Sequence, residues 1–338
     1  VVRGTYFRTP VAVKMPKISR SEDAAREALE REMLKREMRV HKALFDHLPH
    51  SVAQLYGRRK ERCGMVMELA CGTLAQLVHP KEAEPRAEVL ARVLPLYAQV
   101  VEGLHHMHRR GVAHRDVKPD NMLLFKQGDS WQVKLADVAL AQGASNEGLL
   151  LPGTVQYMAP ELFGHGLQWT LDALCALDVY AFGVMLNESM TGLAPWDTAH
   201  GTTVQVNVRL GDRPKTWAAR GIMPAVRPHP CPRLPKPVLR ALPALVEECW
   251  HQDVRKRPSA SDVKDGLLAL LPELPGAGSQ QLSQPRRTQE DAAMVHAVAD
   301  FVRRACGNLT RARAREAAEK AAARDIMSVE RLQEEWGR

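Results

Sequence analysis

Short alternating and apolar runs open the chain. Residues 1–14, VVRGTYFRTPVAVK, alternate apolar and polar side chains around Gly4, a pattern that predicts a β-hairpin turning at this glycine. Residues 52–57 and 63–69 are short apolar runs that are typical of buried strands. We therefore expect a small β-sheet in the N-terminal part of the chain.

Two longer segments carry apolar residues at helical spacing. Residues 19–44 open with Ser19 and Glu22, which fit a capping box, and residues 90–110 show the same periodicity further along. The apolar stripes are formed by Leu29, Met33, Val40 and Leu44 in the first segment, and by Val93, Leu96, Val100, Leu104 and Met107 in the second. The sequence therefore predicts two helices, each with one face for a core.

The character of the sequence changes after Leu271. Residues 272–287 are rich in Pro, Gly, Ser and Gln and are typical of a linker, whereas residues 288–338 are rich in Ala, Arg and Glu and predict a helical tail. An apolar stripe that includes Ile326 and Trp336 could pack back on the preceding domain or hold a regulatory partner. We favour packing, because short helices rarely persist alone.

Composition narrows the class of protein. The 338 residues are 45% hydrophobic and 25% charged, which suits one large or two medium domains. No apolar run approaches the roughly 20 residues of a membrane span, so no membrane segment is expected. Six scattered cysteines without a CxxC pair argue against a zinc site or a disulfide framework, and they favour a reducing, cytoplasmic location.

The net charge of +8 is concentrated near the start of the chain. Residues 1–62 contain 15 Lys and Arg against 8 Asp and Glu. Nucleic-acid binding is not expected, because the basic cluster at 58–62 has no interleaved aromatic residues. The hypothesis of an adaptor that binds RNA or a membrane surface is supported by this charge alone.

Three histidines in the second predicted helix raise the question of a metal site. Only His105 and His108 would share a helix face, while His106 would point elsewhere, and no further ligand is in view. We do not expect a metal there.

The stretch at 111–121, GVAHRDVKPDN, contains the residue types that phosphoryl transfer requires. An Asp such as Asp116 can accept a hydrogen bond from an attacking hydroxyl, and Lys118 can lie against the transferred phosphate. The amide oxygen of Asn121 can ligate Mg²⁺. This stretch closely resembles the catalytic loop of eukaryotic protein kinases.

Further segments resemble kinase motifs, in the order in which the family has them. Lys14 ends VAVK, which resembles the VAIK strand, and Asp137 opens DVA in place of the metal-binding DFG. Glu161 closes MAPE, which resembles the end of the activation segment. Asp178 matches the buried residue that anchors the catalytic loop, and Arg257 matches the residue that pairs with the APE glutamate.

The resemblance implies an α+β fold of two lobes, with residues 1–271 as the kinase domain. The small lobe, about 1–69, would hold a β-sheet and one helix. The large, mainly helical lobe would cover about 70–271, followed by the C-terminal helical extension. The glycine-rich loop that covers the phosphates in the family would lie ahead of Val1, outside this chain.

By resemblance, ATP and Mg²⁺ would bind between the lobes. Asp116 would position the acceptor hydroxyl and accept its proton, Lys118 would neutralise charge on the transferred phosphate, and Lys14 would orient the ATP phosphates. Asn121 and Asp137 would hold the metal.

The helix partner of Lys14 remains open among three glutamates. Glu30, Glu32 and Glu37 compete for this place, and we favour Glu37 because its distance from the next strand best suits the family. Contact with the nucleotide is expected from Val1, Ala12, Lys14, Met67, Glu68, Ala70 and Leu123. In the family Met67 would be the gatekeeper, and the backbone from Glu68 to Ala70 would form the hinge that holds adenine.

The resulting hypothesis is a Ser/Thr kinase that transfers the γ-phosphoryl group of ATP to protein substrates. Cys249-Trp250 and the MAPE segment resemble the tyrosine-kinase-like group, whose members mostly act on Ser and Thr. Lys118 and Thr154 match the Ser/Thr pattern.

The alternative hypothesis is a pseudokinase that binds nucleotide or acts as a scaffold. Val138 and Ala139 replace the Phe and Gly of the DFG motif. By resemblance Val138 would stack with His41, Leu55 and His114, so the apolar stack that aligns the lobes would be thinner than usual. We therefore expect a weakly assembled kinase that depends on a partner, on its tail or on phosphorylation.

Overall fold

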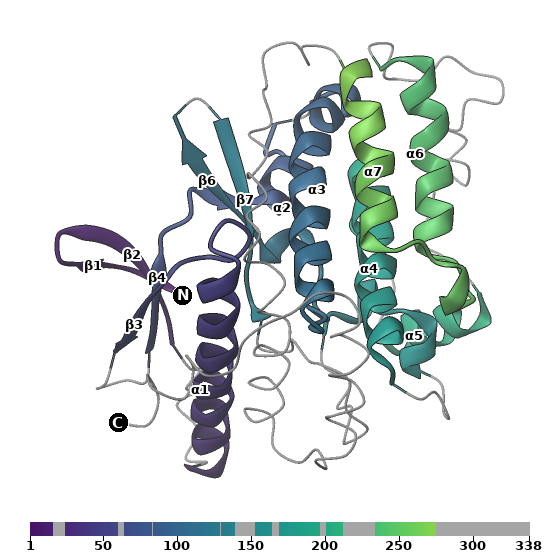
Figure 1. The fold of residues 1–338 in the computed structure, drawn as a ribbon. Coiled ribbons are helices and arrows are strands. Elements are labelled where there is room, and N and C mark those ends of the chain that lie inside the picture. Colours follow the sequence, from purple (N-terminus) through teal and green to yellow (C-terminus); the bar gives the residue numbers. More distant parts are fainter. Residues whose placement is uncertain are drawn as a thin grey trace.

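The computed structural model describes residues 1–15, 24–59, 64–82, 84–128, 130–138, 153–163, 169–196, 201–211 and 234–274. Within these ranges, only the backbone is described for some positions, such as 24–30. Figure 1 shows a small lobe with one β-sheet and helix α1, beside a larger lobe of helices. This is the two-lobed arrangement that the sequence predicts.

The small lobe is built on a four-stranded antiparallel sheet with the strand order β1-β2-β4-β3. Its strands are β1 (Val2–Tyr6), β2 (Thr9–Lys14), β3 (Leu55–Arg59) and β4 (Gly64–Glu68). The inner strand β2 buries Val11, Ala12 and Val13, because it pairs with β1 on one side and with β4 on the other.

The hairpin turns at Phe7 and Arg8, so the predicted turn at Gly4 was wrong. Gly4 lies inside β1 opposite Val11, and the pairing of Tyr6 with Thr9 leaves two residues for the turn. Phe7 and Arg8 have φ angles of 43° and 67°. A two-residue turn with positive φ matches the twist of the paired strands. These side chains gave no local signal, since such turns usually use Gly, Asn or Asp.

Helix α1 (Ala24–His47) packs against this sheet through a different stripe from the predicted one. Leu34 and Met38 are buried together with Met65 and Met67 of β4, whereas Met33 is 52% exposed. Met33 was therefore wrongly predicted as a core position, because the next residue, Leu34, is the one that is buried. Val40 and Leu44 are fully buried as predicted. The predicted cap at residues 19–22 lies outside the described residues.

The large lobe joins a small sheet to a set of helices. Its strands are β5 (Gly72–Thr73), β6 (Met122–Gln127) and β7 (Ser130–Leu135), in the order β5-β6-β7. Its α-helices are α2 (Leu74–Val78), α3 (Arg86–Arg109), α4 (Leu171–Thr191), α5 (Gly201–Leu210), α6 (Lys236–Cys249) and α7 (Ala260–Leu270). Short 3₁₀ helices are formed by Pro119–Asn121, Val155–Tyr157, Pro160–Phe163, Val254–Lys256 and Leu271–Glu273.

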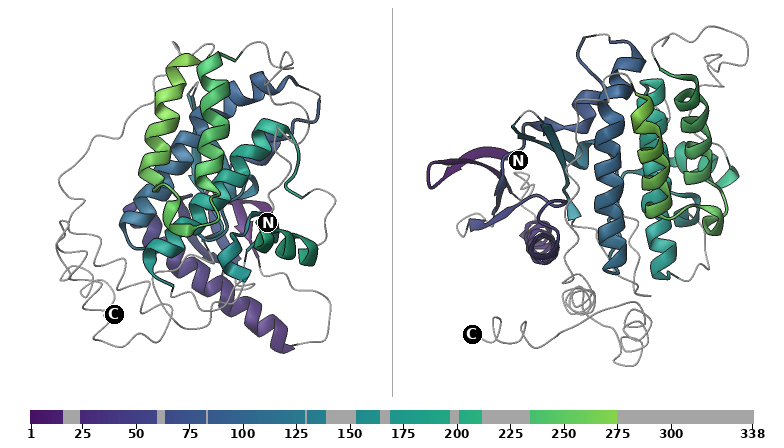
Figure 2. Two further views of the ribbon diagram at one scale, coloured as in Figure 1. Left: turned by 90° about the vertical axis from the view of Figure 1, so that its right-hand side faces the viewer. Right: turned by 45° about the horizontal axis from the view of Figure 1, so that its top comes forward.

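Helix α4 is the centre of the large lobe. It is buried on almost every side from Leu177 onward, and α3 and α6 pack against it. Figure 2 shows the helices of this lobe from two further sides. At the start of α4, the Thr170 side chain accepts a hydrogen bond from the amide of Ala173. At the end of α4, Gly192 has a φ of 71°. A Cβ atom at Gly183 would lie 2.7 Å from the Cβ of Cys249, so glycine permits the close approach of α6.

The C-terminal predictions lie mostly outside the described part of the chain. The helical domain continues to Leu274, and the rest of the expected linker and the whole tail at 288–338 are not among the described residues. None of the described helices is both long enough and apolar enough to span a membrane.

Candidate active site

Asp178 on α4 holds the loop at 111–121 in place through hydrogen bonds to its backbone. Its carboxylate accepts hydrogen bonds of 2.7 Å from the backbone amides of His114 and Arg115, and His108 Nε2 on α3 lies 2.7 Å from Oδ2. Burial alone would raise the pKa of Asp178, but these hydrogen bonds and the His108 charge hold it below its usual value. The anchor stabilises Arg115 at a φ of 69°, a conformation that costs energy without such support.

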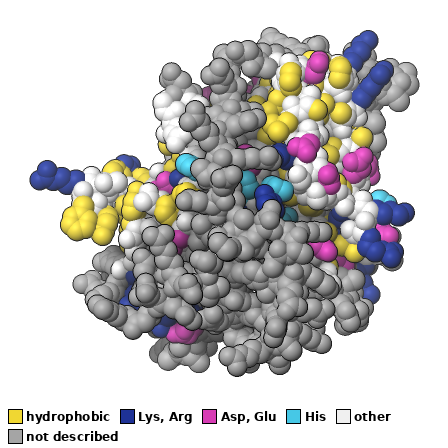
Figure 3. Space-filling model, viewed as in Figure 1, with side chains coloured by type: hydrophobic (Ala, Val, Ile, Leu, Met, Phe, Trp, Pro, Cys, Tyr) yellow, Lys and Arg dark blue, Asp and Glu magenta, His cyan; other side chains and the backbone are white. Residues whose placement is uncertain are grey.

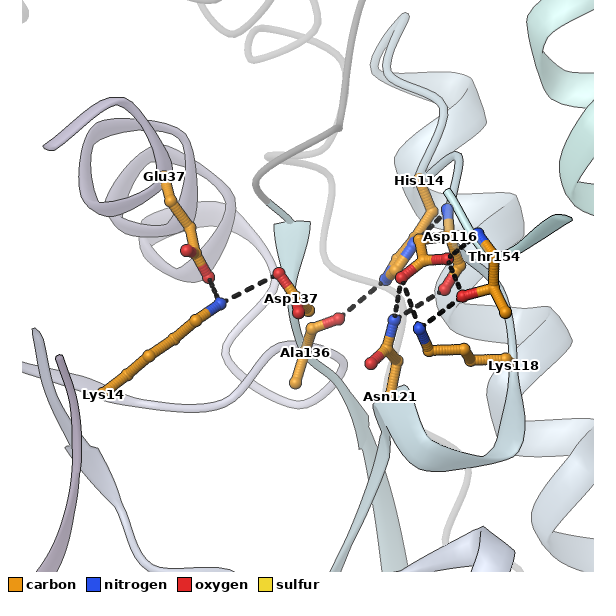
Figure 4. A network of polar contacts seen from close by, with 9 residues as sticks. All are labelled: Lys14, Glu37, His114, Asp116, Lys118, Asn121, Ala136, Asp137 and Thr154. Carbon is orange, nitrogen blue, oxygen red and sulfur yellow. Dashed lines mark hydrogen bonds and ion pairs between the residues drawn. The ribbon is translucent and has the colours of Figure 1, made fainter. Parts of the chain in front are cut away.

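Asp116 lies at the centre of a polar network (Figure 4). Its Oδ1 accepts hydrogen bonds from the amide (3.1 Å) and the hydroxyl (3.0 Å) of Thr154. Its Oδ2 lies 2.8 Å from Asn121 Nδ2 and 2.9 Å from Lys118 Nζ. Burial would raise the pKa of Asp116, but Lys118 and Asn121 outweigh it and keep the pKa low. The carboxylate is therefore ionised at neutral pH.

Thr154 also joins the two predicted catalytic residues of the loop. Lys118 Nζ donates a 2.6 Å hydrogen bond to Thr154 Oγ1, and that hydroxyl donates onward to Asp116. The neighbouring Gly153 has a φ of 134°, and a Cβ there would lie 3.2 Å from the Arg115 carbonyl oxygen. Glycine thus allows the segment to approach the loop closely.

Lys14 bridges two carboxylates from distant parts of the chain. Its Nζ lies 2.6 Å from Glu37 Oε1 on α1 and 2.9 Å from Asp137 Oδ1 after β7. Burial would lower the pKa of Lys14, but the charges of Glu37 and Asp137 outweigh it and raise the pKa. Of the three candidate glutamates, Glu37 is thus the one that the structure places against Lys14. Glu32 pairs with the exposed Lys35 instead, and the Glu30 side chain is not described.

Asn121 and Asp137 fit the requirements of a magnesium site. The Asn121 amide nitrogen donates to both the backbone and the carboxylate of Asp116, which leaves its amide oxygen on the opposite side (Figure 4). The Asp137 carboxylate is 42% exposed, and its φ of 58° is unusual outside glycine. Carboxylate and amide oxygens are ligands that Mg²⁺ prefers, and phosphates and water complete its shell. The described residues contain no group of three His, Cys, Asp or Glu that could hold a metal.

Most of the residues predicted to contact the nucleotide are buried or partly buried, whereas Val1 is exposed. Ala12 and Met67 are directly paired across β2 and β4, and Glu68 and Ala70 follow at the connection to the large lobe. Leu123 lies on β6, partly buried. Val1 precedes β1 and is 82% exposed, so packing in this structure does not place it with the others. The nucleotide-binding roles of all these residues stay predictions.

The predicted apolar stack can be followed in part. Val138, His41 and His114 are fully buried, whereas Leu55 is only partly buried. The Nε2 atom of His41 lies 2.6 Å from the Ala53 carbonyl oxygen, and its Nδ1 is buried without a hydrogen-bond partner. Ala139 lies outside the described residues.

The predicted pair between Glu161 and Arg257 is confirmed as a buried, bidentate ion pair. The two Arg257 Nη atoms lie 2.6 and 2.8 Å from the two carboxylate oxygens of Glu161. Arg257 also donates to the carbonyl oxygens of Ala176 (3.0 Å) and His251 (2.9 Å). The pair ties the segment after Gly153 to the end of the large lobe.

Two contacts around the site were not predicted from the sequence. His108, considered above as a metal ligand, instead pairs with Asp178, and Lys134 Nζ lies 2.6 Å from Glu68 Oε1. The residues of the two pairs are 70 and 66 positions apart in the sequence, so no local pattern connects them.

A family model decides the classification. The model of the protein kinase domain matches residues 5–266. The chain belongs to the protein kinase family. The match covers both lobes of this kinase domain, from the β1–β2 hairpin to helix α7.

Several kinases are similar to this chain. It is 30% identical over 230 residues to a protein kinase and PP2C-like domain-containing protein of Arabidopsis thaliana, covering 61% of this chain and 32% of that protein. It is 29% identical over 267 residues to the serine/threonine/tyrosine-protein kinase HT1 of Arabidopsis thaliana, covering 78% and 61%. For human mitogen-activated protein kinase kinase kinase 7, the values are 28% identity over 263 residues, 76% and 39%. The chain thus spans only part of the length of each of these relatives.

Proposed function

We propose that this kinase domain catalyses transfer of the γ-phosphoryl group of ATP to Ser and Thr residues of protein substrates. The observation that carries the proposal is the Asp116 carboxylate, which is ionised and held by Thr154, Asn121 and Lys118 at the centre of the site. These contacts fix the orientation of a base before any substrate arrives. Such preorganisation is the main contribution that a protein makes to phosphoryl transfer.

The chemistry assigns a separate task to each residue. Asp116 accepts a hydrogen bond from the acceptor hydroxyl and receives its proton as the new oxygen–phosphorus bond forms and the bond to the β-phosphate oxygen breaks. Lys118 offsets negative charge on the transferred group, and Lys14 holds the phosphates at the other end of the site. Asn121 and Asp137 would hold Mg²⁺, which would neutralise charge on the phosphate oxygens when bound.

We infer the preference for Ser and Thr over Tyr as acceptor from resemblance, because Lys118 and Thr154 match the Ser/Thr pattern of the family. The Thr154 hydroxyl contacts both Lys118 and Asp116 and so holds the two side chains close together. One relative, HT1 of Arabidopsis thaliana, is named a serine/threonine/tyrosine-protein kinase. A cytoplasmic location of the kinase fits its scattered cysteines.

The test is a phosphorylation assay on the full-length protein with Mg²⁺ and radiolabelled ATP, using a generic basic protein as acceptor and Lys14→Met as the inactive control. We expect phosphoserine and phosphothreonine after acid hydrolysis. Mainly phosphotyrosine would contradict the acceptor assignment. Nucleotide binding without any transfer above the Lys14→Met background would favour the pseudokinase hypothesis, which rests on Val138 in place of Phe.

A further inference from the structure

The turn between β1 and β2 carries an exposed aromatic side chain on an unfavourable backbone. Phe7 is 86% exposed, and its φ of 43° belongs to a region that two-residue turns normally fill with Asn, Asp or Gly. Arg8 follows with a φ of 67° and is also exposed. Neither burial nor backbone preference therefore explains why an aromatic residue stands at this position.

Phe7 belongs to a small cluster of aromatic rings. The centre of the Tyr6 ring lies 4.6 Å from that of Phe7, in an edge-on arrangement, and 6.1 Å from that of Tyr56, in a stacked arrangement. Tyr6 is 43% exposed, whereas Tyr56 on β3 is partly buried. The apolar surface at this turn is thus formed by rings that support one another, with Phe7 as the most exposed member.

The sheet that carries this cluster is basic. Its four strands and the β1–β2 turn contain four arginines that are exposed or partly exposed, namely Arg3, Arg8, Arg58 and Arg59. Within the same described strands and turn, the one acidic residue is Glu68, whose carboxylate pairs with Lys134 of the large lobe. The exposed rings therefore lie on a surface of positive charge, which favours an anionic partner.

The shape of this region narrows the choice of partner. The β1–β2 hairpin projects from the small lobe on the side away from the large lobe (Figure 1), and Figure 3 shows hydrophobic and basic side chains side by side on this projection. A projecting tip does not enclose a peptide as a groove does, so it requires a partner that yields to it. The headgroup region of a lipid bilayer is such a partner, because it admits aromatic rings while basic side chains reach the anionic groups.

We propose that the hairpin tip, defined as Tyr6, Phe7 and Arg8, is a peripheral contact with membrane surfaces that are rich in anionic lipids. Phe7 enters the boundary between headgroups and acyl chains, and the Tyr6 hydroxyl stays at the level of the headgroups. Arg8 pairs with their negative charges. The residues of the tip are not part of the candidate active site, so the contact does not depend on the proposed phosphoryl transfer.

Single-stranded nucleic acid is the other anionic partner to consider. Proteins that bind it offer separate ring faces, on which successive bases stack along a basic groove. Here the rings of Tyr6, Phe7 and Tyr56 contact one another, and the hairpin that carries two of them is a projection. The geometry therefore favours a lipid surface.

The test is cosedimentation of the full-length protein with phosphatidylcholine vesicles, with and without about 30% phosphatidylserine. Phe7→Asn and Arg8→Gly introduce residues that favour positive φ angles, so neither should disturb the hairpin. Phe7→Trp keeps a large aromatic ring at the tip. Trp131→Ser is the matched control, because it removes an aromatic side chain that is 39% exposed from the sheet of the large lobe.

We expect the wild type to bind the vesicles that contain phosphatidylserine, and to bind them less tightly as salt is added. Phe7→Asn should lower the partition coefficient about 10-fold and Arg8→Gly about 5-fold, because each removes one favourable contact with the bilayer. Phe7→Trp and Trp131→Ser should bind as the wild type does. The melting temperature of each variant checks that it is folded.

Three results would overturn the proposal. One is a folded wild type that does not bind anionic vesicles, including one that binds single-stranded polyuridylate instead. Another is a folded Phe7→Asn that binds vesicles as tightly as the wild type, since charge alone would then account for the attraction. The third is an equal loss of binding in Trp131→Ser and Phe7→Asn, which would show that the hairpin tip has no specific role.

Discussion

The Nζ atom of Lys14 lies 2.6 Å from Oε1 of Glu37, across 23 residues of sequence and from a strand to a helix. Glu37 is 4% exposed, so the contact is made inside the small lobe and holds α1 against β2. Because Lys14 also reaches Asp137, the position of α1 is linked to the predicted metal site. The described structure thus holds α1 against the strand that carries Lys14.

Glu37→Gln should lower kcat/KM for ATP by about 10- to 100-fold, because a charged hydrogen-bond partner of Lys14 becomes neutral. Lys14 would keep its contact with Asp137, so some activity should remain. The matched control is Glu32→Gln, which removes the charge of an exposed glutamate on the same helix. Steady-state kinetics of both variants test this, and equal losses in the two would show that the pairing has no specific role.

His41 should make stability depend on pH. Burial lowers the pKa of His41 to about 4, from 6.5 in the unfolded chain, with a further lowering by Lys14. Between these values the unfolded state binds a proton that the folded state does not, so the free energy of unfolding falls as the pH drops from 6.5 towards 4. The slope contributed by one such group is at most about 1.4 kcal/mol per pH unit.

The measurement for His41 is urea unfolding at pH 7, 6 and 5 for the wild type and for His41→Leu. The leucine variant has no proton to bind and removes the unpartnered Nδ1, although it leaves the Ala53 carbonyl without its hydrogen bond. We expect the difference in stability between variant and wild type to shift in favour of the variant as the pH falls. A difference that is constant from pH 7 to 5 would contradict the assignment.

Glu161→Ala should destabilise the large lobe by about 3–5 kcal/mol, because it leaves the Arg257 guanidinium buried without its counter-charge. The change is read from chemical denaturation or from a marked fall in melting temperature. Arg255→Ala is the matched control, since Arg255 belongs to an exposed pair with Asp253 and little change is expected. A Glu161→Ala variant as stable as the control would mean that the pair does not support the fold.

Much of the fold could be predicted because kinase motifs are local in sequence. A few consecutive residues are enough to recognise the loop around Asp116, the strand that ends at Lys14 and the anchor at Asp178. The choice of Glu37 depended on family spacing rather than on its own surroundings. Local pattern could not decide it, because Glu30 and Glu32 lie on the same charged helix.

Other features could not be predicted from the sequence, for identifiable physical reasons. The turn at Phe7 and Arg8 uses positive φ angles that the strand pairing imposes on side chains that do not favour them. The contacts of Lys134 with Glu68 and of His108 with Asp178 join elements that meet only in the folded chain. Met33 was misplaced because an apolar residue can fit a helical stripe in sequence and still lie on the solvent side.

Asp116 is proposed to serve as the base in phosphoryl transfer. The most direct measurement is the turnover of Asp116→Asn beside the wild type, with ATP affinity determined separately by calorimetry. Asn keeps the shape and one acceptor oxygen, which can still receive the hydrogen bonds from Thr154, but its amide group cannot take the proton. We predict a loss of at least about 100-fold in kcat with nearly unchanged ATP affinity. Equal turnover in variant and wild type would contradict the account.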